Sequence, residues 1–330
     1  MTAPEQELAT FLWEQKLAAP GEEGEWIPLT GGVSSDIWRV ETGRGTFCIK
    51  RALARLKVSA RWEAPVDRNA FEWAYLNVAS EISPGSVPRP IAHDPALGLL
   101  AMAWLAPDRH KLWKSELLHG DVDPDFAGLV GGLLGRIHAA TSTDKSLPAR
   151  FPTDRNFYAL RLDPYLLETA RQHPDLAGRL ESIARTTAAT KWVLVHGDVS
   201  PKNILMGPEG PVLLDAEVAW FGDPAFDVAF CLTHLTVKVR VLPSSAKDPM
   251  TDSIDRFASS YFSRADWEPE HELERRVAAL LPALSLARVD GKSPLEYLDE
   301  EQRSGLRAAA RAAILADKTR LSDAVEALLV

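Results

Sequence analysis

The chain has 330 residues, enough for two domains, and its 46% hydrophobic and 25% charged residues are typical of a globular protein. A net charge of −9, from 37 Lys and Arg against 46 Asp and Glu, argues against binding to nucleic acid or to an anionic membrane. No secretion signal and no run of eighteen apolar residues occurs, and Cys48 and Cys231 lie in apolar surroundings. We therefore expect no membrane span and a cytoplasmic protein with reduced thiols.

The first hundred residues have the pattern of an antiparallel sheet. Short segments rich in β-branched and aromatic residues alternate with glycine-containing turns, which predicts strands at 25–29, 35–40 and 46–50 and further strands near 91–94 and 98–105. A helix is expected between the third and fourth strands, over 67–80. Asp67 would be its N-cap, and Phe71, Tyr75 and Val78 would form its buried face.

After Pro107 the pattern becomes helical. Apolar residues between Phe126 and Ile137 recur at i, i+3, i+4, i+7, i+8 and i+11, which predicts an amphipathic helix. Further helices are expected over Asn156–Arg171, Asp223–Leu235, Asp252–Phe262, His271–Ala287 and Glu301–Leu329. Only 204–206 and 212–215 interrupt them as strands, joined by a turn at 207–210. The predicted fold is α+β and bilobal, with an N-terminal β-rich lobe over 1–105 and a larger helical lobe over 106–330.

The most specific motif is Val195-His196-Gly197-Asp198-Val199-Ser200-Pro201-Lys202-Asn203. It places a His two residues before an Asp and an Asn five residues after it. The catalytic loop of kinases has the same spacing, in which the Asp is the base and the Asn binds magnesium. Asp198 is therefore the candidate catalytic residue, and Asn203 is a candidate metal ligand.

Three more residues follow the kinase order along the chain. Asp215 ends the predicted hairpin, where kinases have a second magnesium carboxylate, and one carboxylate with one amide is sufficient protein ligation for Mg²⁺. Lys50 closes the third predicted strand, like the phosphate-contacting strand lysine. Glu72 on the following helix is its natural ion-pair partner, with Glu63 as the competing choice.

The stretch VLVHGDVSPKNILMGPEGPVLLDAEVAWFGDPAFDVAF resembles the aminoglycoside phosphotransferase and choline kinase-like family of small-molecule kinases. Weaker matches are LTGGVSSDIWRV, FCIK and LLGRIHAAT, so the resemblance covers about 25–235. It implies a kinase-like fold with a nucleotide between the lobes. It also implies the cofactors ATP, with GTP as a possible replacement, and Mg²⁺.

The resemblance also implies the remaining nucleotide contacts. The loop with Gly31, Gly32, Ser34 and Ser35 would approach the phosphates, although it lacks the G-x-G-x-x-G spacing. Lys50, paired with Glu72, would contact the α- and β-phosphates. The apolar segment with Met102 and Trp104 would act as the hinge. His196 and Asp227 would brace the catalytic loop.

The acceptor is where the sequence is least informative. The Asp215-Ala216-Glu217 triplet replaces the Asp-Phe-Gly of protein kinases, which disfavours a protein substrate. A small-molecule hydroxyl is expected instead, on an aminoglycoside or other antibiotic, an amino alcohol or a sugar. The candidate acceptor contacts are Glu217, Trp220, Trp267 and Glu268, and we expect residues 240–290 to set the choice of acceptor.

The sequence thus predicts a Mg²⁺-dependent kinase of a small molecule, either monomeric or homodimeric. The alternative is a catalytically inactive, nucleotide-binding pseudokinase that serves as an interaction module. A complete set of catalytic positions disfavours that alternative.

Overall fold

The computed structural model describes residues 3–29, 35–53 and 67–329. The chain divides into two compact units, 1–109 and 110–330, and each is described by itself. The sequence placed the boundary at 105/106. No helix in the described ranges is long and apolar enough to cross a bilayer.

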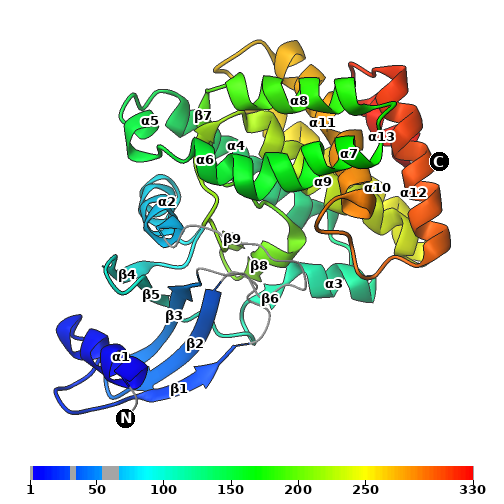
Figure 1. Ribbon diagram of the computed structural model, residues 1–330. Coiled ribbons are helices and arrows are strands. Elements are labelled where there is room, and N and C mark those ends of the chain that lie inside the picture. The colour runs from blue at the N-terminus through cyan, green and yellow to red at the C-terminus, as the bar shows by residue number, and fades with distance from the viewer. Residues whose placement is uncertain (1–2, 30–34, 54–66, 330) are drawn as a thin grey trace. The chain divides into compact units, whose positions relative to one another are not determined.

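The N-terminal unit contains a five-stranded antiparallel sheet with the strand order β1-β2-β3-β5-β4 (Figure 1). Its strands are β1 (Glu25–Pro28), β2 (Ser35–Thr42), β3 (Gly45–Ala52), β4 (Pro90–Asp94) and β5 (Leu99–Ala103). The tight β2–β3 hairpin pairs Thr42 with Gly45, whose φ of 137° suits glycine. The predicted meander is confirmed.

A helix that the sequence analysis missed covers one face of this sheet. Phe11 and Leu12 of α1 (Ala3–Glu14) pack in one apolar cluster with Val40, Ile49 and Ala101. Because successive side chains of a strand point to opposite faces, Lys50 points away from this cluster. The order of the sheet therefore directs Lys50 toward the second helix.

That second helix, α2 (Arg68–Ile82), is present as predicted. Tyr75 and Val78 are buried as expected, whereas Phe71 is only half-buried. The helix also buries Glu72, which the predicted face did not include. Asp67 stands at the N-cap position but makes no side-chain capping bond.

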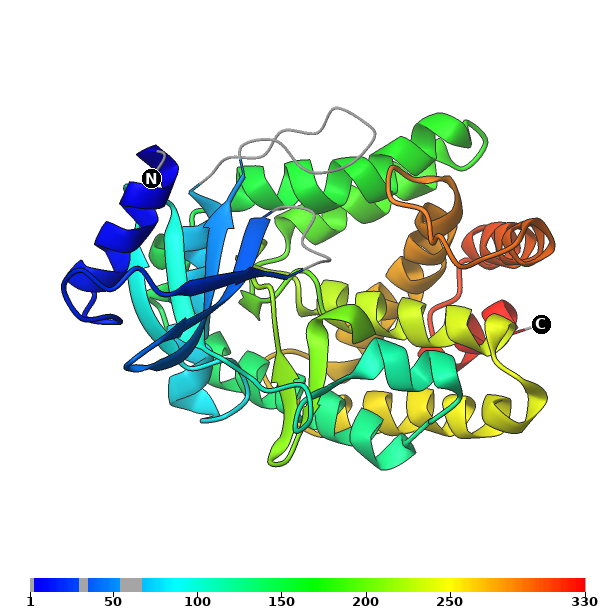
Figure 2. The ribbon, with the colours of Figure 1, turned by 90° about the horizontal axis from the view of Figure 1, so that it is seen from below.

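The C-terminal unit is mostly helical (Figures 1 and 2). Its helices are α3 (Trp113–His119), α4 (Pro124–Ser142), α5 (Leu147–Arg150), α6 (Asp154–Phe157), α7 (Glu168–Gln172), α8 (Ala177–Ala189), α9 (Pro224–Val241), α10 (Ser244–Phe262), α11 (Glu270–Asp290), α12 (Glu300–Ala316) and α13 (Leu321–Leu329). Helix α9 is buried on all sides and packs against α10 and α11, while α10 packs against α4. Asp223 caps α9 by accepting a hydrogen bond from the backbone N–H of Ala225 at 3.0 Å, as predicted.

Two predicted helices are interrupted. The segment expected over Asn156–Arg171 forms α6, a π-helix (Tyr158–Leu167) and α7, because Pro164 has no N–H with which to continue an α-helix. The segment expected over Glu301–Leu329 forms α12 and α13, since the left-handed Asp317, with a φ of 53°, ends α12.

Five short strands lie in the C-terminal unit: β6 (Lys111–Leu112), β7 (Val193–Val195), β8 (Ile204–Gly207), β9 (Gly210–Leu213) and β10 (Trp220–Gly222). The β8–β9 hairpin is the predicted one. The expectation of only two strands here was wrong, because β6, β7 and β10 have three residues or fewer and carry no detectable alternation. Strand β7 leads into the His196–Asn203 loop and pairs antiparallel with β10.

Candidate active site

In the N-terminal unit, Lys50 and Glu72 form a buried ion pair. Lys50 Nζ donates to Glu72 Oε1 at 2.7 Å and to Oε2 at 2.8 Å, and the exposed fractions of the two residues are 5% and 2%. The expected pairing is confirmed, although we expected Glu72 to lie off the buried stripe. A buried lysine held by a carboxylate keeps its charge and a fixed position, which suits contact with a phosphate.

In the C-terminal unit, Asp227 of α9 holds the start of the catalytic loop. Its carboxylate accepts the backbone N–H of His196 at 2.7 Å and that of Gly197 at 2.8 Å. His138 of α4 lies 3.4 Å from the same carboxylate and 2.9 Å from the hydroxyl of Tyr261. Asp227 therefore braces the loop, as the sequence analysis expected.

Gly197 allows the loop to turn next to the segment that follows Asp215. Its φ is 80°, and a Cβ added there would lie 2.8 Å from the carbonyl oxygen of Val218. The carbonyl oxygen of Gly197 accepts a hydrogen bond from Arg161 Nε. Any other residue at 197 would strain the backbone and displace Asp198.

Asp198 is buried, and its two carboxylate oxygens differ in their surroundings. Oδ2 accepts a hydrogen bond from Asn203 Nδ2 at 2.8 Å and lies 3.0 Å from Lys202 Nζ and 3.2 Å from Arg161 Nη2. Oδ1 is buried and has no hydrogen-bond partner. Since a buried carboxylate oxygen is normally satisfied, Oδ1 is the place for a donor from a bound molecule.

Asn203 and Asp215 lie close together at the end of the β8–β9 hairpin. The backbone N–H of Leu214 donates to the carbonyl of Asn203 at 2.8 Å. Asn203 Nδ2 donates to the carbonyl of Asp198 at 3.1 Å as well as to its carboxylate, which leaves the amide oxygen for a cation. Asp215 has a φ of 66°, a left-handed conformation that is strained for a residue other than glycine. One amide oxygen and one carboxylate are hard donors that suit Mg²⁺.

The charges of the loop follow from burial and ion pairing. Burial opposes ionisation of Asp198, but Lys202 and Arg161 hold the pKa of its carboxyl below the ordinary value. Burial lowers the pKa of His196, so its ring is neutral and its Nδ1 accepts the backbone N–H of Asp198 at 3.2 Å. Asp198 is therefore ionised at neutral pH and ready to accept a hydrogen bond.

Two candidate acceptor contacts follow Asp215. Trp220 is buried in β10, stacks on Phe157 at 4.0 Å and donates to Asp154 at 2.6 Å, so it belongs to the core. Glu217 is half-buried and contributes to the electrostatic field at Arg161. Contact between Glu217 and the acceptor stays a prediction.

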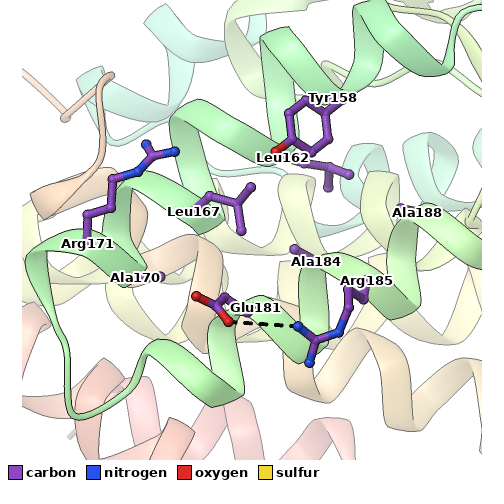
Figure 3. A pocket seen from close by; sticks show the side chains of 9 residues that line it. All are labelled: Tyr158, Leu162, Leu167, Ala170, Arg171, Glu181, Ala184, Arg185 and Ala188. Carbon is purple, nitrogen blue, oxygen red and sulfur yellow. Dashed lines mark ion pairs between the residues drawn. The ribbon is translucent and has the colours of Figure 1, made fainter.

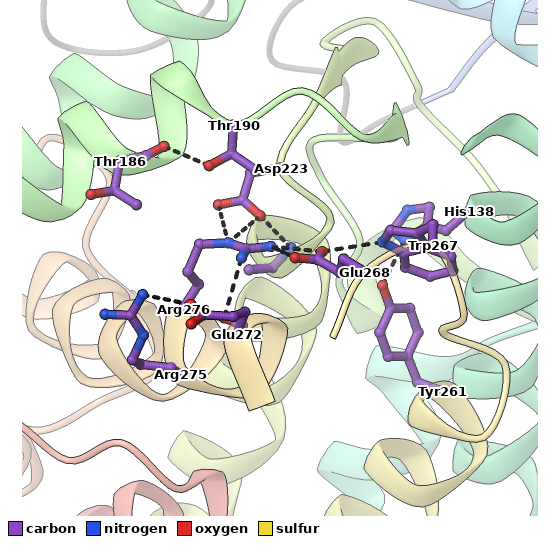
Figure 4. A network of polar contacts seen from close by, with 11 residues as sticks. His138, Thr186, Thr190, Asp223, Tyr261, Trp267, Glu268, Glu272, Arg275 and Arg276 are labelled. Carbon is purple, nitrogen blue, oxygen red and sulfur yellow. Dashed lines mark hydrogen bonds and ion pairs between the residues drawn. The ribbon is translucent and has the colours of Figure 1, made fainter. Parts of the chain in front are cut away.

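The other two candidates, Trp267 and Glu268, belong to a charged network (Figure 4). Arg276 donates to Glu268 at 2.7 and 2.8 Å and to Asp223 at 3.1 and 3.2 Å, and Trp267 donates to Glu268 at 3.1 Å. We call Asp223, Trp267, Glu268 and Arg276 the Arg276 network. Burial raises the pKa of Asp223 to about 6 although Arg276 opposes the shift. This packing favours a structural role for Trp267 and Glu268 over contact with the acceptor.

The remaining nucleotide candidates lie in the N-terminal unit. Met102 is buried in β5 opposite Cys48, and the Trp104 ring lies 5.6 Å below the guanidinium of Arg39. Ser35 begins β2. Gly31, Gly32, Ser34 and the competing Glu63 lie outside the described residues, so their roles stay predictions.

Sequence reasoning missed Arg161 and Lys202. Lys202 lies inside the quoted motif, one residue before Asn203, and this position was the available signal. Arg161 had no local signal, because the π-helix around Pro164 brings it to the loop.

A surface pocket is unrelated to this site. Figure 3 shows it between the π-helix, α7 and α8, where Tyr158, Leu162, Leu167, Ala170, Arg171, Glu181, Ala184, Arg185 and Ala188 line it. None of the candidate site residues lines this pocket.

The fold and the loop geometry define a kinase-like architecture. Residues 25–247 match the model of the phosphotransferase enzyme family, and the chain belongs to that family. Among curated relatives, the methylthioribose kinase of Erwinia tasmaniensis is 23% identical over 228 residues, which are 61% of this chain and 56% of the relative. That of Pectobacterium carotovorum is 24% identical over 232 residues, or 62% and 57%. The chain thus spans little more than half the length of these relatives.

Solved structures share the fold. A choline kinase from Cryptosporidium parvum has a TM-score of 0.59 at 11% identity, with 98% of each chain covered. A choline/ethanolamine kinase family protein from Mesorhizobium loti has a TM-score of 0.55 at 16% identity, with 99% of each covered. An amicoumacin kinase in complex with AMP-PNP, Ca²⁺ and Ami has a TM-score of 0.56 at 14% identity, with 97% of each covered. The predicted α+β fold and the resemblance to this family are confirmed.

Proposed function

We propose that the chain transfers the γ-phosphate of ATP to a hydroxyl of a small molecule. The observation that carries this proposal is the surroundings of Asp198, a buried carboxylate with one partnerless oxygen beside Asn203 and Asp215. Family membership and the names of the relatives, which are kinases of methylthioribose and choline, support the same reaction. GTP remains an alternative donor.

In this reaction Asp198 Oδ1 accepts a hydrogen bond from the acceptor hydroxyl and takes up its proton as the hydroxyl oxygen attacks the γ-phosphorus. The bond from that phosphorus to the bridging oxygen breaks, and ADP leaves with this oxygen. Asn203 and Lys202 hold Oδ2 and so aim the other oxygen at the acceptor. The reaction requires alignment of the two substrates and neutralisation of phosphate charge more than covalent help from the protein.

Asn203 and Asp215 are the proposed ligands of Mg²⁺. A Mg²⁺ ion held by these two residues would neutralise charge on the phosphates of the nucleotide. The amicoumacin kinase structure, which contains AMP-PNP and Ca²⁺, supports a nucleotide and a divalent cation for this fold. We propose Lys50, held by Glu72, as the contact for the α- and β-phosphates, and a cytoplasmic location where ATP is abundant.

The test is a nucleotide-consumption screen with ATP and Mg²⁺ across neutral, cationic and anionic alcohols. The Asp198→Asn variant serves as the inactive control. Acceptor-dependent release of ADP by the wild type and its loss in the variant are expected. ADP release that is equal in both proteins, or absent with every class of acceptor, would contradict the proposal.

A further inference from the structure

Basic side chains gather in the C-terminal unit, and two of them, Arg161 and Lys202, pair with Asp198. Arg161 comes from the π-helix, Lys202 from the catalytic loop, His234 and Lys238 from α9, and Arg288 from α11. We call these five residues the cationic cluster. Lys114 of α3 lies at its edge, where it and Lys238 share the Tyr297 ring, at 6.0 and 5.4 Å from the ring centroid.

A chain of contacts connects this cluster to Asp198. The Arg161 guanidinium lies 5.9 Å from both the Tyr165 and the Phe230 ring, and Arg161 itself pairs with Asp198. The Arg288 guanidinium also lies 5.7 Å from the Tyr165 ring, and it donates to the Tyr165 hydroxyl at 3.3 Å. The His234 ring lies 5.3 Å from the Phe230 ring.

The positive charge of the cluster is only partly compensated, since Asp198 pairs with Arg161 and Lys202. Within the described ranges, Lys114, Lys238 and Arg288 form no ion pair with a carboxylate. Lys238 is 1% exposed, and its Nζ makes only a 3.5 Å contact to the carbonyl of His234. A buried ammonium normally has a carboxylate partner. The described residues supply no such partner to Lys238, so a bound anion would fill this role.

Several polar atoms of the cluster also lack partners. His234 Nε2, Arg288 Nε and the Tyr297 hydroxyl are buried without a hydrogen bond. Because buried polar atoms usually make a hydrogen bond, several neighbouring atoms without one indicate that a ligand is missing. Arg288 is a cation, the Tyr297 hydroxyl is a donor, and the neutral His234 ring can donate from Nε2, so a ligand that satisfies all three is an oxyanion.

Electrostatics at these residues agrees with this reading. Burial, together with the charges of Lys114 and Arg288, lowers the pKa of Lys238 to about 7. Burial, together with Arg288, Lys238, Lys202 and Lys114, lowers the pKa of His234 well below its ordinary value. An anion placed here would reverse this mutual repulsion.

We infer that the acceptor is an anionic alcohol, whose carboxylate or phosphate group binds the cationic cluster while its hydroxyl lies at Asp198. This inference rests on the proposed function for the position of the hydroxyl. It separates this chain from a kinase of a cationic acceptor such as choline, because an ammonium group would meet like charges beside Asp198.

The first test uses inorganic sulfate as the probe, measured by isothermal titration and by its effect on the unfolding midpoint at constant ionic strength. Wild type should bind sulfate, and Lys238→Met should weaken binding at least tenfold. Lys145→Met, which removes an exposed lysine elsewhere, is the matched control and should bind like wild type. No sulfate binding by wild type, or equal binding by wild type and Lys238→Met, would overturn the inference.

The second test uses polyols that differ at one terminal group: gluconate, sorbitol 6-phosphate, sorbitol and 1-amino-1-deoxysorbitol. Turnover of either anionic polyol in preference to the other two is expected, and the preferred one distinguishes carboxylate from phosphate. Turnover of cationic alcohols only would overturn the inference and leave the proposed function standing. Sulfate binding that depends on Lys238, without turnover of any alcohol in the wider screen, would overturn the proposed function alone.

Discussion

Two charged regions of the C-terminal unit differ in how their charges are matched. In the Arg276 network, one guanidinium meets two carboxylates at hydrogen-bond distance, and each partner is satisfied. In the cationic cluster, Asp198 is the carboxylate that pairs with Arg161 and Lys202, and Lys238 and Arg288 have none. Matched buried charges hold a fold together, whereas unmatched ones are typical of a site that a ligand completes.

The comparison also explains why acidic and aromatic residues near the C-terminus are a poor guide to the acceptor. Trp267 and Glu268 form a combination that suits a hydroxylated or cationic ligand when the sequence alone is considered. In the structure Arg276 donates to both carboxylate oxygens of Glu268. The protein itself therefore already supplies a cation to Glu268.

The largest expected effect comes from the carboxylate shared by the catalytic loop and the cluster. Asp198→Asn should reduce turnover by about 10²–10⁴-fold, because the amide cannot take up the acceptor proton. Nucleotide binding should persist, since Asn203, Asp215 and Lys50 are unchanged. Steady-state kinetics and nucleotide titration measure the two effects. The control is Asp125→Asn, an exposed aspartate paired with Arg256; equal turnover of both variants would remove Asp198 from the mechanism.

Removing the guanidinium of the Arg276 network should lower the stability of the fold without changing the choice of acceptor. Arg276→Met leaves Asp223 and Glu268 buried without their cation, which should cost about 3–5 kcal/mol in the free energy of unfolding. Urea denaturation measures this loss. The KM of the acceptor should stay within about twofold of wild type in the fraction that remains folded, since chemistry takes place at Asp198. A large rise of that KM with unchanged stability would assign the Arg276 network to the acceptor site.

Removing the Lys238 charge from the cationic cluster should instead raise the stability of the fold. Lys238→Met should raise the free energy of unfolding at pH 7 by about 1–4 kcal/mol, because it replaces a buried ammonium with a side chain of similar shape. It should also weaken sulfate binding at least tenfold. Loss of stability together with unchanged sulfate binding would show that Lys238 is an ordinary structural residue.

The pH dependence of the unfolding free energy gives a second test of the role of Lys238. The folded-state pKa of Lys238 is about 7 and its ordinary value is 10.5, so the unfolded chain binds more protons between these pH values. Stability of the wild type should therefore rise with pH over this window through this group, and the gain from Lys238→Met should shrink. The groups facing Lys238 are Lys114, Arg288, Cys231, His234 and Tyr297. Unfolding midpoints at pH 7 and pH 10 measure the difference.

The sequence predicted the parts of the molecule whose signals are local. The strands of the first sheet, the amphipathic helix around Phe126 and the Asp223 cap are readable from periodicity and from single residues. The spacing from His196 to Asn203 identified the loop because its geometry is set within one short segment. The ion pair of Lys50 and Glu72 was predicted because the residue order matches that of kinases.

The rest depends on packing between distant segments. Arg161 reaches Asp198 only because a π-helix forms at Pro164, and Lys238 comes near Lys114 because both lie over the Tyr297 ring. Neither pairing has a sequence signal. The burial of Glu72 on α2 likewise depends on its ion pair with Lys50 from a distant strand, although the apolar pattern predicted the buried Tyr75 and Val78 of the same helix.

The smallest expected effect distinguishes the two regions most directly. Trp267→Phe keeps an aromatic ring beside His138 and Tyr261 but removes the 3.1 Å hydrogen bond to Glu268. Because Glu268 retains both hydrogen bonds from Arg276, no buried charge is left unpaired, and the loss should be about 1 kcal/mol. Urea denaturation measures it. The KM values for acceptor and nucleotide should both be unchanged. If the acceptor KM rose tenfold while the nucleotide KM and stability did not change, Trp267 would touch the acceptor, and a matched ion-pair network would no longer indicate a purely structural region in this fold.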